Sequence, residues 1–232
     1  KMKLSIILCV YNEIRVIEQS FRELYDDCEL QNIDYEIIIV DNDSTDGTRE
    51  WLDKLDNSRA VKIFNQKNIG KGGSIKKAIK QAAGEYLIIF DPDKEYETQS
   101  IWDCLAKIEN SSSQCVLGSR RLEKHRNYKY VVNYYGVVFL STLINILYGT
   151  SLTDTATAVK CFNSSFIKQV PLTSDGFNLD FELVCRVARF GGSIEEVHVN
   201  YFPRSKKEGK KIKVFSDGLA SLIVILRDRF IK

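Results

Sequence analysis

The apolar residues in the first half of the chain fall into short continuous runs, separated by segments of helical periodicity. The runs cover residues 4–10, 35–40, 61–64, 87–90 and 115–118. Runs of this length are typical of strands that are buried on both faces. Four helices are predicted between these runs. The first covers residues 14–26, and the second begins after a cap at one of residues 44–46. The third begins at a cap, Ser74, and ends at Ala83, and the fourth covers residues 100–108. This alternation predicts an α/β fold with a doubly wound, mainly parallel sheet flanked by helices.

The pattern changes after residue 118. Residues 130–153 carry no charged side chain, and residues 131–148 are rich in Val, Leu, Ile, Phe and Tyr. The length approaches that of a transmembrane helix, but polar residues such as Asn133 and Asn145 interrupt it. We expect one or two helices that lie partly in a membrane interface, and an ordinary pair of core helices fits the pattern equally well.

The end of the chain adds further amphipathic elements. Residues 180–190 have helical spacing, residues 193–202 alternate like a half-buried strand, and residues 214–230 form a mostly apolar predicted helix. Residues 204–213 contain six basic side chains and one acidic one. A basic segment beside apolar helices is typical of a protein that rests on anionic lipid, although a solvated loop also explains a run of charge.

Composition limits the function further. The 232 residues, 44% of them hydrophobic, are enough for one sizeable core. With 33 basic and 31 acidic residues the formal charge is +2, so no overall field favours nucleic acid, and we expect no nucleic-acid partner. The six cysteines form no C-x-x-C pair, and residues 4–10 are not followed by a signal-peptide cleavage site. These features predict reduced cysteines and a cytoplasmic protein, placed at the cytoplasmic face of a membrane.

Acidic residues follow three of the predicted strands. Glu13 follows the first strand, Asp41 and Asp43 follow the second, and the fourth leads into Asp91, Asp93 and Glu95. In a doubly wound sheet these strand ends converge on one crevice. Clustered carboxylates repel one another unless a cation lies among them, and Mg²⁺ or Mn²⁺ prefers such oxygen ligands. An acidic turn with Pro92 at its corner is the simpler alternative.

Two common nucleotide-binding motifs are missing. No G-x-G-x-x-G follows the first strand, which argues against a dinucleotide-dependent dehydrogenase. The segment Gly70-Lys71-Gly72-Gly73-Ser74 does not have the spacing of a P-loop.

Three ordered motifs resemble those of the family 2 glycosyltransferases, which have the GT-A fold. They are Val10-Tyr11-Asn12-Glu13, Val40-Asp41-Asn42-Asp43-Ser44-Thr45-Asp46-Gly47 and Asp91-Pro92-Asp93. The order of the later motifs is similar to that of the polyprenyl-phosphate branch of the family, which includes dolichyl-phosphate mannose synthases. It consists of Gly118-Ser119-Arg120, Asp154-Thr155, Lys160-Cys161-Phe162 and the basic run that begins at Arg204.

The resemblance implies an inverting transfer of sugar from a UDP- or GDP-sugar donor. Residues 1–125 would form the donor-binding half and residues 126–232 the acceptor-side half of a single GT-A domain, with amphipathic C-terminal helices. Asp91 and Asp93, with Glu95 as a third ligand, would hold Mg²⁺ or Mn²⁺ against the donor diphosphate. Donor contacts would come from Tyr11, Asn12, Glu13, Asp41, Asp43, Lys71 and Arg120, and from Arg204 with Lys210 as a basic lid.

Asp154 is assigned with Asp93 to the catalytic group. A sugar hydroxyl acceptor needs a base to remove its proton, whereas a lipid phosphate is already largely ionised near neutral pH. Asp154 is therefore either that base or a residue that orients the acceptor or helps to hold the metal, and a structural cap or turn is its simpler role.

Two departures from the family pattern affect specificity. Asn42 replaces the second aspartate of the usual pair, which leaves the nucleobase open, and Lys210 replaces a common serine, which leaves the acceptor open. We expect a polyprenyl phosphate acceptor and peripheral membrane contact. The alternatives are a saccharide hydroxyl acceptor, a nucleotidyltransferase, or a nucleotide-sugar binder without activity.

Overall fold

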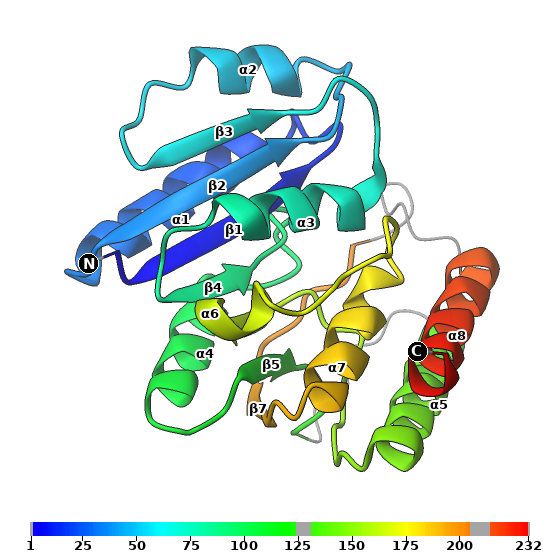
Figure 1. Cartoon of the computed structure of the whole chain (residues 1–232). Helices are drawn as coiled ribbons and strands as arrows, with labels where there is room; N and C mark the ends of the chain where they lie inside the picture. Colours follow the sequence, from blue (N-terminus) through cyan, green and yellow to red (C-terminus); the bar gives the residue numbers. More distant parts are fainter. Residues whose placement is uncertain (1, 124–130, 205–213, 232) are drawn as a thin grey trace.

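The computed structural model describes residues 2–123, 131–204 and 214–231, and within them a seven-stranded sheet forms the centre of the molecule (Figure 1). Its strands are β1 (Leu4–Val10), β2 (Tyr35–Asp41), β3 (Ala60–Phe64), β4 (Tyr86–Ile89), β5 (Cys115–Ser119), β6 (Lys160–Asn163) and β7 (Ile194–His198). Their order across the sheet is β3-β2-β1-β4-β6-β5-β7.

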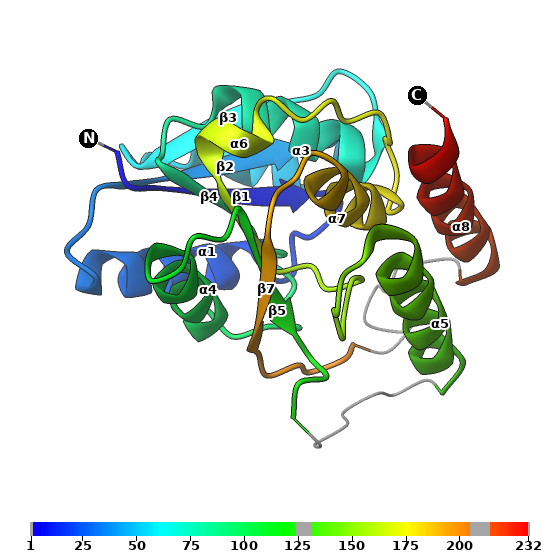
Figure 2. The same cartoon turned by 60° about the horizontal axis from the view of Figure 1, so that its bottom comes forward.

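The helices cover both faces of this sheet. They are α1 (Ile17–Leu30), α2 (Thr48–Lys54), α3 (Gly70–Gln81), α4 (Gln99–Glu109), α5 (Val131–Tyr148), α6 (Ser164–Ile167), α7 (Leu179–Arg189) and α8 (Val214–Phe230). One apolar core lies between the sheet and α1, α2 and α4, and a second lies between the sheet and α3, α5, α6, α7 and α8. Figure 2 shows these layers on opposite sides of the strands. Two covered faces explain why the strands read as continuous apolar runs.

The prediction of a doubly wound, mainly parallel sheet is confirmed. Strand β1 is parallel to β2 and to β4, β2 is parallel to β3, and β5 is parallel to β7. Strand β6 runs antiparallel to both β4 and β5. It also places a strand from the later half of the chain between two strands from the earlier half, so residues 1–125 and 126–232 share one sheet.

Most element boundaries lie close to the sequence pattern, but α1 lies at residues 17–30 instead of 14–26, β7 ends at residue 198 instead of 202, and α3 begins before its predicted cap. Strand β1 and helix α8 have the predicted bounds. Helix α3 begins at Gly70, although Ser74 was predicted as its cap. Ser74 lies buried inside the helix, where its hydroxyl accepts a hydrogen bond from Asn65 Nδ2 at 3.0 Å. The Ser74 hydroxyl therefore binds the loop after β3 and does not cap the helix.

The long uncharged segment forms a single helix, α5, which lies beside α8 (Figures 1 and 2). The Tyr148 hydroxyl donates to the Ile225 carbonyl at 2.8 Å, which joins the two helices. Each helix also exposes large apolar side chains, among them Phe139 and Ile146 on α5 and Ile223 and Phe230 on α8. No helix in the described ranges has the length and apolar character needed to span a bilayer.

Candidate active site

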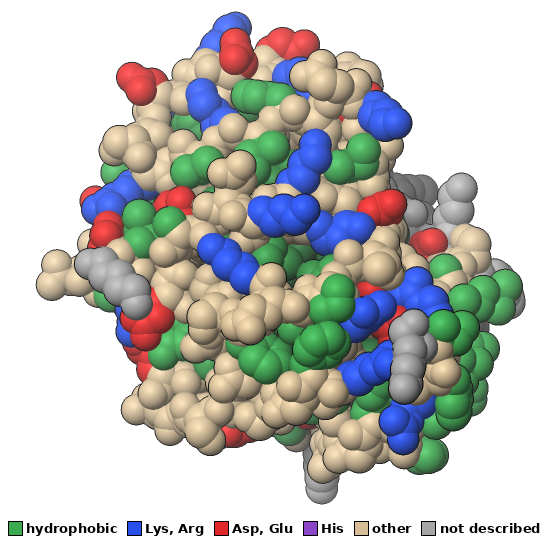
Figure 3. Space-filling model, in the orientation of Figure 1, with side chains coloured by type: hydrophobic (Ala, Val, Ile, Leu, Met, Phe, Trp, Pro, Cys, Tyr) green, Lys and Arg blue, Asp and Glu red, His purple; other side chains and the backbone are tan. Residues whose placement is uncertain are grey.

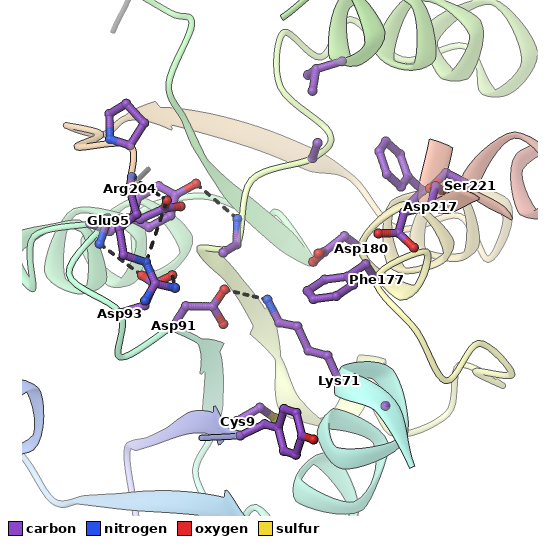
Figure 4. Close-up of a pocket in the computed structure, with 18 of the residues that line it drawn as sticks. Cys9, Lys71, Asp91, Asp93, Glu95, Phe177, Asp180, Arg204, Asp217 and Ser221 are labelled. Carbon is purple, nitrogen blue, oxygen red and sulfur yellow. Dashed lines mark hydrogen bonds and ion pairs between the residues drawn. The ribbon is translucent and has the colours of Figure 1, made fainter. Parts of the chain in front are cut away.

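A cavity of about 470 Å³ opens at the carboxyl ends of β1, β2 and β4. Asp91, Asp93 and Glu95 from the loop after β4 form its acidic end (Figure 4). Its other end is bounded by α5 and α8, which contribute Leu140 and Ser221 among other residues. The parallel strands therefore bring two of the three predicted acidic groups together, because Glu13, Asp91, Asp93 and Glu95 line the cavity whereas Asp41 and Asp43 do not.

Asp91 and Asp93 concentrate negative charge in a poorly hydrated position. The side chain of Asp91 is 21% exposed and that of Asp93 is 14% exposed. Burial and the neighbouring carboxylate of Asp91 raise the pKa of Asp93 above its ordinary value. A cation between these two carboxylates would relieve the repulsion.

Two basic side chains supply that positive charge in the structure. Lys71 Nζ lies 2.6 Å from Asp91 Oδ2, and an Arg204 terminal nitrogen lies 2.7 Å from Asp93 Oδ2 (Figure 4). Arg204 also lies 3.3 Å from Glu13 Oε2. Although burial lowers the pKa of Lys71, the carboxylates of Asp91 and Asp180 raise it above its ordinary value. Both basic groups therefore stay charged and face the position predicted for a diphosphate.

Glu95 is engaged by the segment that follows β7. One of its carboxylate oxygens accepts from the Tyr201 hydroxyl at 3.1 Å, and the other accepts from the Arg204 backbone N–H at 2.8 Å. These two hydrogen bonds connect the segment that contains Arg204 to the loop that contains Asp93. Glu95 thus has a positioning contact in addition to its place in the cavity wall.

The donor atoms at the acidic end fit a hard divalent cation. Within the described residues, no three His, Cys, Asp or Glu side chains gather closely enough to hold a metal alone. Asp91 and Asp93 nevertheless line one cavity and offer only oxygen atoms. Mg²⁺ is commonly held by one or two carboxylates together with substrate phosphates, so this pair suits a site that the substrate completes.

The loop after β2 places Asn42, rather than its acidic neighbours, in the cavity wall. Asp41 is fully buried and accepts from Arg49 Nε at 2.7 Å and from the Ser44 backbone N–H at 3.3 Å. Asp43 is 40% exposed and lies 3.9 Å from Arg49. Asp41 and Asp43 therefore both face Arg49, and Asn42 is the residue among these three that lines the cavity.

The loop after β1 contributes Tyr11 and Glu13 to the cavity. Asn12 instead joins this loop to the one after β2, because its side-chain oxygen accepts from the Thr45 backbone N–H at 2.8 Å. Asn12 has a φ of +53°, in the left-handed region that asparagine tolerates better than most residues. Of the three residues predicted to contact the donor from this loop, Tyr11 and Glu13 line the cavity, and Asn12 connects the two loops.

Asp154 lies behind Arg120, with its side chain fully buried. Its two carboxylate oxygens accept from Arg120 Nε at 2.6 Å and from a terminal Arg120 nitrogen at 2.7 Å. Burial raises the pKa of Asp154, but Arg120 outweighs this effect and the pKa lies below its ordinary value. A carboxylate so paired is a weak base, and its contact holds Arg120, which lines the cavity.

Asp180 is a cavity residue that the sequence analysis missed. It lies in the first turn of α7, and one of its oxygens accepts from the fully buried Lys160 Nζ at 2.8 Å. Phe177, just before this helix, also lines the cavity (Figure 4). The sequence signal for Asp180 is an acidic residue in the first turn of an amphipathic helix, and such a residue also occurs where it only stabilises the helix N-terminus. Lys210 lies outside the described residues.

The sequence profile of Glycosyl transferase family 2 matches residues 5–169. Dolichol-phosphate mannosyltransferase of Pyrococcus furiosus is 32% identical over 120 residues, which cover 51% of this chain and 33% of the relative. Cholesterol galactosyltransferase of Borreliella burgdorferi is 34% identical over 50% of this chain and 32% of its own length. The chain thus matches about a third of each of these proteins. Dolichyl-phosphate beta-glucosyltransferase of Dictyostelium discoideum is 27% identical over 98% of this chain and 74% of its own.

Solved structures share the fold at low sequence identity. Mannosyl-3-phosphoglycerate synthase from Rubrobacter xylanophilus superposes with a TM-score of 0.76 and 15% identity, covering 97% of this chain and 73% of that one. Glucosyl-3-phosphoglycerate synthase from Mycobacterium tuberculosis, solved with Mn²⁺, UDP and glucosyl-3-phosphoglycerate, superposes with a TM-score of 0.75 and 16% identity. The match covers 100% of this chain and 81% of that one. With the profile match extending over most of the chain, this protein belongs to glycosyl transferase family 2.

Proposed function

We propose that this protein transfers a sugar from a nucleotide-sugar donor to a polyprenyl phosphate, with inversion at the anomeric carbon. The observation that carries the proposal is one continuous cavity with two chemically different ends. Its acidic end, at Asp91 and Asp93, suits a metal-bound diphosphate, and its far end reaches α5 and α8. Relatives named for dolichol phosphate support the same acceptor class.

Asp91 and Asp93 would hold Mg²⁺ or Mn²⁺, whose charge would stabilise the departing nucleoside diphosphate. Lys71, Arg120 and Arg204 line the same cavity and would bind the phosphate oxygens. In that arrangement Arg204 would exchange its contact with Asp93 for one with the diphosphate. The Mn²⁺ and UDP named for the Mycobacterium tuberculosis neighbour support this assignment of the acidic end.

The nucleoside would lie between the loops after β1 and β2, beside Tyr11 and Asn42. Asn42 Nδ2 donates to Asn68 Oδ1 at 2.9 Å, and its oxygen accepts from the Ile69 backbone N–H at 2.9 Å. Asn68 also lines the cavity, so these amides form a neutral polar wall. Neutral amides can both donate to and accept from a nucleobase. We expect the choice between UDP- and GDP-sugars to depend on them.

The acceptor would enter from the side of α5 and α8. Val137 and Leu140 of α5 line the cavity, while Tyr135 and Phe139 of the same helix are 65% and 59% exposed. Figure 3 shows hydrophobic side chains along the edge where these helices lie, close to Lys and Arg side chains. Such a surface suits peripheral contact with the cytoplasmic face of an anionic membrane.

The chemistry follows from the charge of the acceptor. A phosphate monoester is already ionised near pH 7, so no protein base has to remove a proton. The residues of the chain would then bind, orient and shield the reactants. Asp154 would hold Arg120 in position, and Arg120 would contact a phosphate oxygen.

Asp180 supports a second candidate, transfer to a hydroxyl group. Its carboxylate lines the cavity, is 13% exposed, and among the described residues forms a side-chain hydrogen bond with Lys160 only. A base at this position would accept the proton of an attacking hydroxyl. The relative named for cholesterol, an acceptor with a hydroxyl group, fits this candidate.

The test is a panel of UDP- and GDP-sugars with Mn²⁺, assayed for nucleoside diphosphate release with polyprenyl phosphate, with free saccharides, and with neither. We expect release that depends on polyprenyl phosphate and stops when the metal is chelated. Asp180→Asn should keep this activity within about 10-fold, because an ionised acceptor needs no base. Release with saccharides that is lost in Asp180→Asn would establish the second candidate. Pyrophosphate release would indicate a nucleotidyltransferase, and binding without turnover a non-catalytic protein.

A further inference from the structure

We infer, on the basis of the donor site proposed above, that Glu182 positions Lys71 for the donor diphosphate. Glu182 lies on α7 and is fully buried outside the cavity lining. Its connection to Lys71 runs through residues 173–177, which we call the clamp loop. Glu182 is therefore a positioning residue of the donor site.

The clamp loop packs directly against the start of α3. A Cβ atom at Gly70 would lie 2.1 Å from the Asp175 carbonyl oxygen, and one at Gly72 would lie 2.7 Å from the Ser174 carbonyl oxygen. The Gly73 backbone N–H donates to the Asp175 carbonyl at 3.1 Å. These approaches leave no room for side chains, so the backbone on both sides of Lys71 rests on the loop.

The same loop also reaches the side chain of Lys71. Lys71 Nζ lies 5.9 Å from the centre of the Phe177 ring while it pairs with Asp91 Oδ2 at 2.6 Å. A cation within about 6 Å of a ring face is attracted to it. The clamp loop thus fixes both the backbone and the ammonium group of Lys71.

Glu182 determines the shape of the clamp loop. One of its oxygens accepts from the Thr173 backbone N–H at 2.9 Å and from the Thr173 hydroxyl at 2.7 Å. The other accepts from the Ser174 backbone N–H at 2.6 Å. Hydrogen bonds to a buried carboxylate are strong, and losing them leaves backbone donors without partners.

Arginines secure Glu182 from the opposite side and connect it to α8. Arg186 and Arg227 lie 3.4 Å and 3.2 Å from its carboxylate. Arg186 also donates to the buried Asp228 of α8 at 2.9 Å and 3.1 Å. The end of α8 is thereby tied, through Glu182, to the lysine at the acidic end of the cavity.

A double-mutant cycle tests this role. Glu182→Gln keeps the side-chain volume but turns one acceptor into an NH₂ group that faces N–H donors. We expect it to raise the dissociation constant of Mn²⁺–UDP or Mn²⁺–GDP, measured by calorimetry, by about 10-fold. In a Lys71→Met background the same change should have almost no further effect, because the residue it positions is gone.

Glu36→Gln is the matched control. Glu36 is also buried and accepts from the Ser5 hydroxyl and from the Ala83 backbone N–H, both at 2.6 Å. This variant should lower the melting temperature but leave nucleotide affinity unchanged. If Glu182→Gln does not fold, Thr173→Val removes one hydrogen bond to Glu182 and should weaken binding by about 3-fold.

A readout without nucleotide separates this role from the donor proposal. Acylation of the Lys71 amine, followed by mass spectrometry, should be about 10-fold faster in Glu182→Gln than in the wild type or in Glu36→Gln. Faster labelling in a protein that binds neither UDP nor GDP would refute the donor proposal and keep the positioning role. Unchanged labelling, unchanged affinity, or an equal loss of affinity with and without Lys71 would each overturn the positioning role.

Discussion

The two ends of the cavity are built in different ways. At the acidic end, loops from β1 and β4 and the start of α3 hold charged side chains in ion pairs, such as Lys71 with Asp91. At the other end, Val137 and Leu140 of α5 line the cavity, while Phe139 of α5 and Ile223 of α8 lie on the surface. The described charges of the acidic end are thus paired within the protein, while the helical end exposes apolar surface that fits the proposed lipid contact.

The largest expected effect is at the acidic end. Asp91→Asn and Asp93→Asn should each lower turnover by at least about 10³-fold, because each removes a proposed metal ligand and leaves a basic partner without its counter-charge. Turnover with Mn²⁺ and added polyprenyl phosphate measures this. Asp53→Asn, on the exposed face of α2, is the control and should retain full activity. A normal rate in either cavity variant would refute the proposed metal site.

Filling the helical end should affect the acceptor but not the donor. Val137→Trp places a large side chain in the cavity wall, so the KM for polyprenyl phosphate should rise by about 30-fold while nucleotide affinity stays unchanged. Val138→Trp, one position further along α5, tests whether helix damage alone has this effect. Equal changes in the two variants, or a loss of nucleotide binding, would contradict a division of the cavity into two ends.

The outer surface of the helices should control membrane contact. Leu219 and Ile223 of α8 are 60% and 56% exposed, and changing both to Glu puts charge where lipid would lie. Flotation with anionic vesicles should fall by about 10-fold, and nucleotide affinity should not change. Changing Val61, an exposed apolar residue of β3 at the other edge of the sheet, to Glu is the control. Undiminished flotation of the double variant would place the lipid contact elsewhere.

The last expected effect is on stability instead of binding or turnover, and it concerns the buried pair of Arg120 and Asp154. Asp154→Asn should lower the free energy of unfolding at pH 7 by about 3 kcal/mol, because Arg120 loses its buried partner. The folded-state pKa of Asp154 lies below its unfolded value of about 3.9, so its contribution is present above that pH and is lost as the pH falls through the folded pKa. Denaturant unfolding at pH 7 and pH 3 should show the difference between variant and wild type shrinking on acidification. A difference that grows on acidification would contradict the lowered pKa.

The strand ends are the part of the site that local sequence predicts well. Continuous apolar runs identify buried parallel strands, and parallel strands bring Glu13, Asp91 and Asp93 to the same edge. The same reasoning does not predict which side chain at a strand end faces the cavity. Neighbouring residues at a strand end point to opposite sides, so Asn42 faces the cavity while Asp41 binds Arg49.

Long-range contacts are the part that local sequence does not predict. Asp180 reaches the cavity because α7 packs near α3, which no pattern within residues 180–190 reveals. The ion pair between Arg120 and Asp154 joins residues 34 positions apart in the sequence. The direction of β6 is also set by its neighbours, since a strand of only four residues, Lys160–Asn163, fits either orientation.

The position of β6 has a consequence for the order in which the chain assembles. Strands β4 and β5 can be joined only through residues 160–163, which follow β4 by some seventy positions, and closing so long a loop slows folding. Until the ribosome has released that segment, β4 and β5 each expose an unpaired, apolar edge. A nascent chain that stalls before residue 160 is therefore a target for chaperones and for aggregation.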